Sequence, residues 1–337
     1  TKIATDIGFP VLIKASAGGG GKGMRVVSSE SELKQSLISA QNEAEKSFGD
    51  KRVFIEKYIT NPRHIEIQIL ADKFGSCIYL GERECSIQRR NQKVIEEAPS
   101  PFLDSKLRKK MGEQAVSLAK AVNYSSAGTV EFIVDEEKNF YFLEMNTRLQ
   151  VEHPVTELIT GLDLVELMIK VAYGEQLKLS QEEIKLKGWA LESRIYAEDP
   201  YRNFLPSTGR LKKFKPPQVS NEEDKIIRND CGVIEGGEIS IYYDPMISKL
   251  CSWGKTREEA ISFMQEALDD YQIEGIGQNI PFLHSVYRNH DFCKGNISTA
   301  FIENNYPEGF KGEALSEEER NQLAALITFA NHKKNLR

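Results

Sequence analysis

Polar and apolar residues alternate along an extended stretch near the middle of the chain, residues 140–154. Successive side chains of a strand point to opposite faces, so this alternation separates two sets of residues. The apolar face carries Tyr141, Leu143, Met145, Leu149 and Val151. The other face carries Glu144, Asn146, Arg148, Gln150 and Glu152. Two carboxylates, a guanidinium and two amides are too charged for ordinary core, and the alternation is too regular for plain surface. The pattern therefore predicts a strand that carries functional groups.

A second strand, residues 129–134, places a single glutamate, Glu131, among apolar residues, and residues 135–139 are typical of a hairpin turn. If the two strands pair, Glu131 and Glu144 meet on one face. Two close carboxylates repel each other unless a cation lies between them or a pKa is strongly raised. Carboxylates with an asparagine or water are usual Mg²⁺ ligands at nucleotide sites. We favour Mg²⁺; the alternative is a structural ion-pair lattice neutralised by Arg148.

The first 60 residues alternate between short strands and helices around a glycine-rich segment. They predict a helix (1–8), strands (9–14, 24–27 and 53–59) and a helix that a capping box at Ser29 begins and Gly49 ends. Residues 18–23 match G-x-G-x-x-G, but that motif must open a helix, and Gly23 occupies the Ser/Thr position of a Walker loop. With Lys14 and Lys22, this segment indicates a mobile phosphate lid, or alternatively a floppy surface hairpin.

Two polar segments follow. Residues 64–70 alternate, with His64, Glu66 and Gln68 on one face, which predicts a half-exposed strand. Residues 82–94 are dense in charge and amides but lack helical periodicity. They are either a solvated loop or an active-site loop that brings Gln88 and Lys93 to a nucleotide.

The remaining elements are apolar and regular. Helices are expected at 105–122, packed against the hairpin of Glu131 and Glu144, and at 161–172 and 256–271. Strands are expected at 189–196, which carries Glu192 and Arg194, and at 239–250. A capping box at Ser316 begins a last helix with no later element to pack on. Because the chain also lacks an initiator methionine, we expect it to be a fragment of a longer protein.

Composition narrows the class of protein. A chain of 337 residues with 40% hydrophobic and 28% charged residues is long enough for two globular domains of about 150 residues each. A net charge of −6 disfavours nucleic acid as a partner, and no apolar run approaches the length of a membrane span. The five cysteines are scattered without a C-x-x-C pair, which favours a reducing compartment over a disulfide framework or zinc site.

Together these motifs resemble the biotin carboxylases, a family with the ATP-grasp fold. The resemblance covers residues 1–310 and is carried by Lys14, the glycine segment, Glu56-Lys57, Glu131 and the run from Glu144 to Pro154. Within the family, segments 82–93, 124–132 and 241–246 are most similar to the propionyl-CoA carboxylases.

The resemblance implies an α+β fold, with a small glycine-flap lid lobe, a larger antiparallel-sheet lobe and a C-terminal biotin carboxylase subdomain. The corresponding residues are 1–60, 61–185 and 186–311, and 312–337 would begin a linker that docks a partner. The N-terminal α/β domain of the family, which supplies a further ATP-binding lysine, is expected to be absent from this chain.

The resemblance also implies roles for individual residues. Lys14 and the flap glycines, including Gly19, Gly20, Gly21 and Gly23, would hold the ATP phosphates. Glu56 and Lys57 would lie at the adenine, with His64 and Gln88 near the ribose. Mg²⁺ or Mn²⁺ would bind Glu131, Glu144 and Asn146. Bicarbonate would bind Arg148, Gln150, the Val151 backbone and Lys93. Glu152 would take its proton as general base, giving carboxyphosphate, and Arg194 would stabilise the enolate of biotin.

Biotin would be attached to a carrier domain outside this chain, and a carboxyltransferase beta subunit would complete an oligomeric complex. The resemblance favours the bacterial cytoplasm or the mitochondrial matrix. Two alternatives stay open: another ATP-grasp ligase, such as a carbamoyl-phosphate synthetase or a purine-pathway carboxylase, and a truncated, non-catalytic interaction fragment. The bicarbonate set and Arg194 favour the biotin route.

Overall fold

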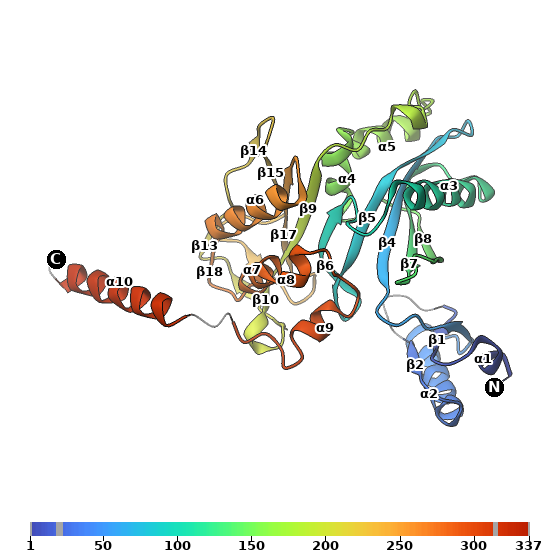
Figure 1. Ribbon diagram of the computed structural model, residues 1–337, viewed down its shortest axis with the longest axis horizontal. Helices are drawn as coiled ribbons and strands as arrows, with labels where there is room; N and C mark the ends of the chain where they lie inside the picture. The colour runs from blue at the N-terminus through green and yellow to red at the C-terminus, as the bar shows by residue number, and fades with distance from the viewer. Residues whose placement is uncertain (1, 18–22, 313–315, 336–337) are drawn as a thin grey trace.

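A computed structural model describes residues 2–17, 23–312 and 316–335. The small lobe at the N-terminus contains α1 (Lys2–Ile7), β1 (Val11–Ala15), β2 (Arg25–Val27), α2 (Glu30–Phe48) and β3 (Val53–Lys57). Its strands form an antiparallel sheet of order β2-β1-β3, and the apolar residues of α2 pack on it around Val11 and Ile13. Figure 1 shows this lobe beside the start of β4, at one end of the molecule. The predicted elements of this lobe are confirmed.

An antiparallel sheet of order β14-β15-β17-β9-β6-β5-β4-β7-β8 forms the body of the molecule. The strands are β4 (Arg63–Ala71), β5 (Cys77–Arg89), β6 (Gln92–Ala98), β7 (Ser126–Val134), β8 (Phe140–Asn146), β9 (Trp189–Tyr196), β14 (Ser220–Asn221), β15 (Ile226–Cys231) and β17 (Met246–Gly254). The sheet is continuous across residue 186, where the sequence analysis divides the larger lobe from the C-terminal subdomain, and that division stays a prediction.

Helices cover the body of the sheet. They are α3 (Ser105–Ala121), α4 (His153–Thr160), α5 (Leu164–Tyr173), α6 (Arg257–Asp270), α7 (Ile280–Arg288), α8 (His290–Cys293) and α9 (Phe301–Asn305), with one-turn helices η1 (Gln181–Glu183) and η2 (Pro200–Arg202). Short strand pairs complete the C-terminal part: β10 (Glu198–Asp199) with β11 (Leu205–Pro206), β12 (Gly209–Arg210) with β16 (Glu238–Ile239), and β13 (Lys213–Lys215) with β18 (Gln272–Glu274).

Among the described residues, the two largest apolar clusters lie between helices and this sheet. One joins α6 and α7 to β9 and β17, and the other joins α3 to β4 and β7. Helix α4 packs against β5, β6, β9 and β17, where polar side chains lie between the helix and the sheet. The last helix, α10 (Glu317–Asn335), extends away from the body (Figure 1), and its side chains from Glu317 to Lys333 are exposed. Among the described residues, no helix combines the length and apolar character that crossing a bilayer requires.

Residues 82–94 were predicted to form a loop, and this prediction is wrong, because they form sheet. The segment belongs to β5 and β6, joined by a tight turn in which Arg90 and Asn91 have φ of 52° and 63°. Its acids are buried and paired with cations from other elements: Glu82 accepts two hydrogen bonds from Arg108 of α3, at 2.6 and 2.7 Å. Charge in a sequence indicates solvent only when no partner is available, and here the fold supplies one.

Strand β8 is shorter than predicted. It ends at Asn146, so the face shared by Glu144 and Asn146 does not continue as strand to Glu152. The chain instead turns, and Pro154 lies in the first turn of α4, where its missing N–H costs nothing. The strand predicted at 239–250 is likewise interrupted, because β16 ends at Ile239 and β17 begins at Met246.

Three smaller expectations are also corrected. His64, Glu66 and Gln68 are buried, because polar side chains from β5 and β6 bond to all three on this face of β4. Helix α3 packs mainly on β4 and β5, touching the hairpin through apolar residues of β7. The box at Ser29 is incomplete: the Ser29 side chain makes no capping bond, although Glu32 accepts one from the Ser28 N–H at 3.3 Å.

Candidate active site

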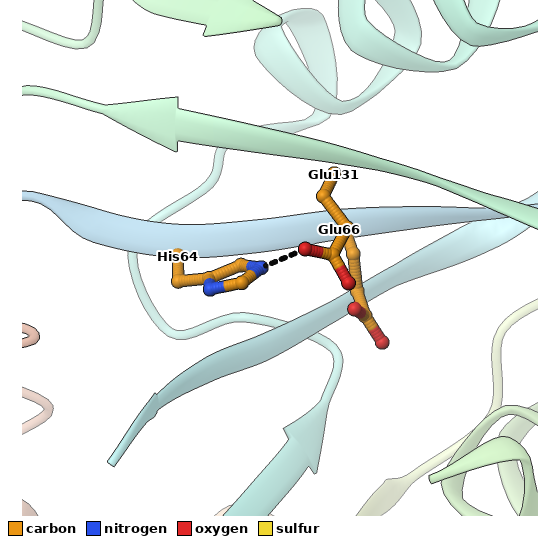
Figure 2. Close-up of side chains that lie close together, drawn as sticks. All are labelled: His64, Glu66 and Glu131. Carbon is orange, nitrogen blue, oxygen red and sulfur yellow. Dashed lines mark ion pairs between the residues drawn. The ribbon is translucent and has the colours of Figure 1, made fainter. Parts of the chain in front are cut away.

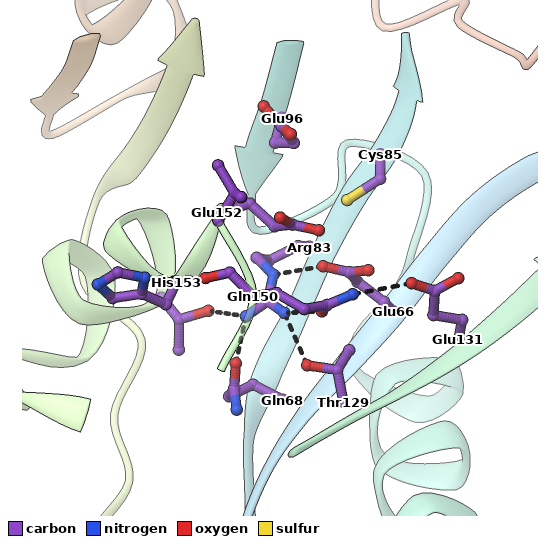
Figure 3. Close-up of polar contacts among 12 residues, drawn as sticks. Glu66, Gln68, Arg83, Cys85, Glu96, Thr129, Glu131, Gln150, Glu152 and His153 are labelled. Carbon is purple, nitrogen blue, oxygen red and sulfur yellow. Dashed lines mark hydrogen bonds and ion pairs between the residues drawn. The ribbon is translucent and has the colours of Figure 1, made fainter. Parts of the chain in front are cut away.

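A fully buried guanidinium, Arg83 of β5, lies at the centre of the polar layer under α4 (Figure 3). Its Nε donates to Glu66 Oε1 at 2.6 Å. Its two Nη atoms donate to four neutral oxygens at 2.6–3.0 Å, which belong to Gln68, Thr129, Gln150 and Thr156. All five N–H donors of the guanidinium are therefore used, and they tie β4, β5, β7 and α4 into one rigid unit.

Lys93 of β6 joins three carboxylates. Its Nζ lies 2.5 Å from Glu66 Oε2, 2.6 Å from Glu152 Oε1 and 3.2 Å from Glu131 Oε1. Burial opposes the charged amine, but Glu66 and the other acids raise the pKa of Lys93 well above its ordinary value. Burial likewise opposes a charged Glu66, yet Lys93 and Arg83 lower the pKa of that carboxyl to about 2. Near neutral pH the layer therefore holds a fixed cation among fixed anions.

Glu152 occupies the position before α4 and is buried between two cations. One oxygen accepts from Lys93, and Oε2 accepts from Arg194 Nη2 at 2.9 Å. Arg194 of β9 is itself held from behind, because its Nε donates to Glu96 Oε1 at 2.6 Å. A carboxylate fixed in this way points into a polar layer at a helix N-terminus, where an anionic substrate is also stabilised.

The hairpin of β7 and β8 brings the predicted metal ligands together. Glu131 and Glu144 are directly opposite in register. Asn146 Nδ2 lies 3.0 Å from Glu131 Oε1 and 3.4 Å from Glu144 Oε1. Burial alone raises the pKa of Glu131, but contacts with His64 and Lys93 outweigh it and hold that pKa below its ordinary range. An ionised carboxylate beside a second carboxylate and an amide is a donor set that fits Mg²⁺.

Other donor atoms also cluster here (Figure 2). Those of His64, Glu66 and Glu131 lie within 4.8 Å of one another, as do those of Glu66, Cys85 and Glu152. Glu66 belongs to both groups and is already neutralised by Lys93 at 2.5 Å and Arg83 at 2.6 Å, whereas Glu131 lies farther from Lys93, at 3.2 Å. Glu131 together with Glu144 is therefore the better match for a divalent cation.

The predicted ribose residues form a chain that ends on the same hairpin. His64 Nε2 lies 2.9 Å from Glu131 Oε2, and His64 Nδ1 lies 2.7 Å from Gln88 Nε2. Gln88 also donates to the Cys85 carbonyl at 2.7 Å, which fixes its amide. His64 and Gln88 thus join the cluster of Glu131, although 24 residues separate them in the sequence.

The residues predicted to bind bicarbonate differ in burial and in their contacts. Gln150 is buried, and its Nε2 donates to Glu131 Oε1 at 2.9 Å. Arg148 is exposed, and its guanidinium contacts the Leu149 carbonyl at 3.3 Å instead of the buried acids. The Val151 carbonyl accepts from Lys249 Nζ at 2.8 Å.

The predicted nucleotide residues of the small lobe lie on β1 and β3. Lys14 Nζ contacts Glu56 Oε2 at 3.3 Å, and Lys57 Nζ donates to the Gly8 carbonyl at 2.9 Å. Gly23 has a left-handed φ of 73° and its amide donates to Glu43 at 3.3 Å. Gly19, Gly20 and Gly21 lie outside the described residues.

Sequence reasoning missed four groups that organise the site: Glu66, Arg83, Glu96 and Lys249. Glu66 appeared only as part of a polar strand face, and Lys249 only as the end of a strand. Arg83 stood between two glutamates, a pattern that indicates alternating strand faces once 82–94 is treated as sheet.

A substrate anion could be held here by lysine, guanidinium and amide donors while Glu152 accepts its proton.

Two protein-family models match the chain. Residues 1–180 match the carbamoyl-phosphate synthase L chain, ATP binding domain, and residues 192–304 match the biotin carboxylase C-terminal domain. Among curated proteins, the chain is 61% identical to the propionyl-CoA carboxylase alpha chain of Ruegeria pomeroyi, over 96% of this chain and 50% of that protein. It is 60% identical to the mitochondrial alpha chain of Sus scrofa, over 97% of this chain and 44% of that protein. The chain thus spans about half the length of these relatives.

Solved structures share the fold. A biotin carboxylase from Campylobacter jejuni, in complex with β,γ-ATP, superposes with a TM-score of 0.86 at 48% identity. The biotin carboxylase domain of 2-oxoglutarate carboxylase from Hydrogenobacter thermophilus, with MgADP, ADP and bicarbonate, gives 0.85 at 48% identity. Each match covers 90% of this chain and 66% of the other. The predicted ATP-grasp arrangement, with a small lobe and a large antiparallel sheet, is confirmed.

Proposed function

The chain belongs to the biotin carboxylase family of the ATP-grasp fold, and on that basis we propose that it carboxylates biotin with bicarbonate and MgATP. We further propose that it serves a propionyl-CoA carboxylase. The support is 61% and 60% identity to alpha chains with that name. The observation that carries the activity is the position of Glu152, held between Lys93 and Arg194.

Bicarbonate binds at Lys93, at the Gln150 amide, at the Val151 backbone and at Arg148, which moves inward from its exposed position. Glu152 accepts the bicarbonate proton, and the resulting oxygen attacks the γ-phosphorus of ATP. A new P–O bond forms as the bond to ADP breaks, giving carboxyphosphate. Bound at Glu131, Glu144 and Asn146, Mg²⁺ or Mn²⁺ would supply charge neutralisation for the phosphates.

Carboxyphosphate then decomposes to CO₂ and phosphate beside Arg194. Biotin loses its ring N–H proton to the released phosphate, and its nitrogen attacks CO₂. Arg194 stabilises the negative charge on the ureido oxygen, because its guanidinium is fixed in a buried, low-dielectric layer. The proposal gives Arg194 and Glu152 distinct tasks although they touch each other.

ATP is proposed to bind between the two lobes. Lys14 and the glycine segment would hold the phosphates, Glu56 and Lys57 the adenine, and His64 and Gln88 the ribose. The ammonium of Lys57 must leave the Gly8 carbonyl to do so. Backbone amides of a glycine-rich segment can approach phosphate oxygens closely because no Cβ intervenes.

The partners are also proposals. Biotin would arrive on a carrier domain, and a carboxyltransferase beta subunit would use the product within an oligomeric complex. The relatives come from a bacterium and from mitochondria, so we propose the bacterial cytoplasm or the mitochondrial matrix as the location. Another ATP-grasp ligase, such as a carbamoyl-phosphate synthetase, is not favoured, because residues 192–304 match the biotin carboxylase C-terminal domain. A non-catalytic fragment is not favoured either.

The test is Glu152→Gln in the full-length protein. Glutamine keeps the size of the side chain and one acceptor oxygen but cannot accept a proton, so bicarbonate-dependent ATP hydrolysis should fall by about 100-fold or more while ATP affinity is retained. Glu82→Gln is the matched control, because Glu82 is equally buried but pairs with Arg108 outside the site. Loss of ATP binding in parallel with turnover would refute the general-base role.

A further inference from the structure

Two buried glutamates lie side by side under α4, beyond the residues assigned above. Glu96 of β6 and Glu192 of β9 are directly opposite each other in an antiparallel pair, and neither side chain has any exposed surface. Side chains at such positions point to the same face with Cβ atoms about 5 Å apart. The two carboxyl groups are therefore neighbours in a region without solvent.

Each carboxyl group has one oxygen with a partner and one without. Glu96 Oε1 accepts from Arg194, and Glu192 Oε2 lies 3.4 Å from the Cys251 thiol. Within the described part of the chain, Glu96 Oε2 and Glu192 Oε1 have no hydrogen-bond donor. A buried oxygen without a partner is costly, and a proton held between the two carboxyls would satisfy both oxygens at once.

Charge balance leads to the same conclusion. The buried layer carries more carboxylates than permanent cations among the described residues. The cations that contact its acids are Lys93, Arg83 and Arg194. The buried carboxylates are Glu66, Glu96, Glu131, Glu152 and Glu192. One proton on the Glu96–Glu192 pair reduces this excess of negative charge without moving any side chain.

The neighbours of the pair come from every element packed around it. They are Lys93 on the same strand, Arg194 on β9, Glu152 before α4, and Lys249 and Cys251 on β17. Burial is the main cause that raises the pKa of Glu96 to about 7, against the opposing charge of Arg194. Burial and the adjacent Glu96 raise the pKa of Glu192 well above its ordinary value.

We propose that Glu96 and Glu192 share one proton and act as a positioning pair, which holds Arg194 against Glu152. Arg194 is the link: its guanidinium contacts Glu96 at 2.5–2.6 Å and Glu152 at 2.9 Å. With one shared proton, the pair carries a single negative charge that anchors Arg194 from behind. Loss of that proton places two adjacent anions beside Arg194 and draws the guanidinium away from Glu152.

The positioning role rests on the proposed function, whereas the shared proton does not. Infrared spectroscopy of the full-length protein tests the shared proton directly. At about pH 8 ordinary carboxyl groups are ionised, so a protonated C=O stretch reports an unusual acid. Wild type should show this band, and Glu192→Gln should remove it. In the control Glu84→Gln the band of the pair should persist, because Glu84 is equally buried but is paired with Arg63 and Ser100. A band unchanged in Glu192→Gln would overturn the shared proton.

Kinetics then test the positioning. Glutamine at position 192 keeps a donor for Glu96 and has no proton to lose. Glu192→Gln should therefore retain biotin-dependent turnover within about 3-fold at neutral pH and lack the alkaline decline in turnover that we expect of wild type. Glu96→Gln removes the anion behind Arg194, so it should lower kcat by about 10-fold or more with little change in the KM for ATP. An unchanged pH profile in Glu192→Gln, or full kcat in Glu96→Gln, would overturn the positioning role. Absence of turnover in wild type would instead refute the proposed function and leave the infrared result standing.

Discussion

Replacing Arg83 with methionine removes the charge that joins three strands of the sheet to α4. Methionine fills much of the same volume, so the change isolates the five hydrogen bonds of the guanidinium. Four neutral oxygens lose a donor, and Glu66 keeps only Lys93 as a cationic partner. Removing one member of a buried ion pair costs about 3–5 kcal/mol, since the remaining charge stays desolvated. A loss of that size is a large part of the stability of a typical domain.

Urea unfolding of the purified protein measures this loss. With a slope of about 3 kcal/mol per molar urea, the midpoint for Arg83→Met should fall by about 1–1.7 M. Arg52→Met is the control, because Arg52 pairs with Asp50 at an exposed site and its loss should leave the midpoint nearly unchanged. Equal midpoints for the two variants would refute the conclusion that the Arg83 network holds the site together.

Three further predictions concern stability. The folded state keeps the pKa of Glu66 near 2, below its unfolded value, so this carboxyl binds fewer protons when the protein is folded. Its contribution to the free energy of unfolding is therefore lost as pH falls from about 4.5 to about 2. In denaturant titrations, Lys93→Met should reduce this loss of stability at acid pH. Gly188→Ala should cost about 2–3 kcal/mol in thermal unfolding, because its φ is 65° and a Cβ would lie 2.4 Å from a backbone oxygen, whereas Gly161→Ala, with φ of 72° and open space, should cost less. Thr256→Ala should destabilise α6 by about 1 kcal/mol, since the Thr256 hydroxyl accepts a hydrogen bond from the Glu259 N–H in the first turn of the helix; no loss in chemical denaturation would contradict the cap.

Local patterns were sufficient for much of the fold. The strand at 189–196 was predicted with its observed bounds, and the hairpin that pairs Glu131 with Glu144 was predicted in the observed register, because a tight turn and alternation determine that register. The capping box predicted at Ser316 also follows from a few adjacent residues. These features depend on contacts within a short span of sequence.

The rest depends on partners distant in sequence. The sequence alone makes the charges of 82–94 look solvated, because the partner of Glu82 is Arg108 on α3 and the partner of Glu84 is Arg63 on β4. The role of Arg83 could not be predicted, because its five acceptors come from two strands, a loop and a helix between residues 66 and 156. The end of β8 at Asn146 is set by the packing of α4 on the sheet, which the alternation of residues 140–154 does not encode.

The most direct test of the proposed activity is phosphate release from MgATP by the full-length protein, with bicarbonate present and free biotin added or withheld. The arrangement of Lys93, Glu152 and Arg194 predicts hydrolysis that requires bicarbonate and that biotin accelerates. Hydrolysis that proceeds equally without bicarbonate, or that ignores biotin, would contradict a biotin carboxylase.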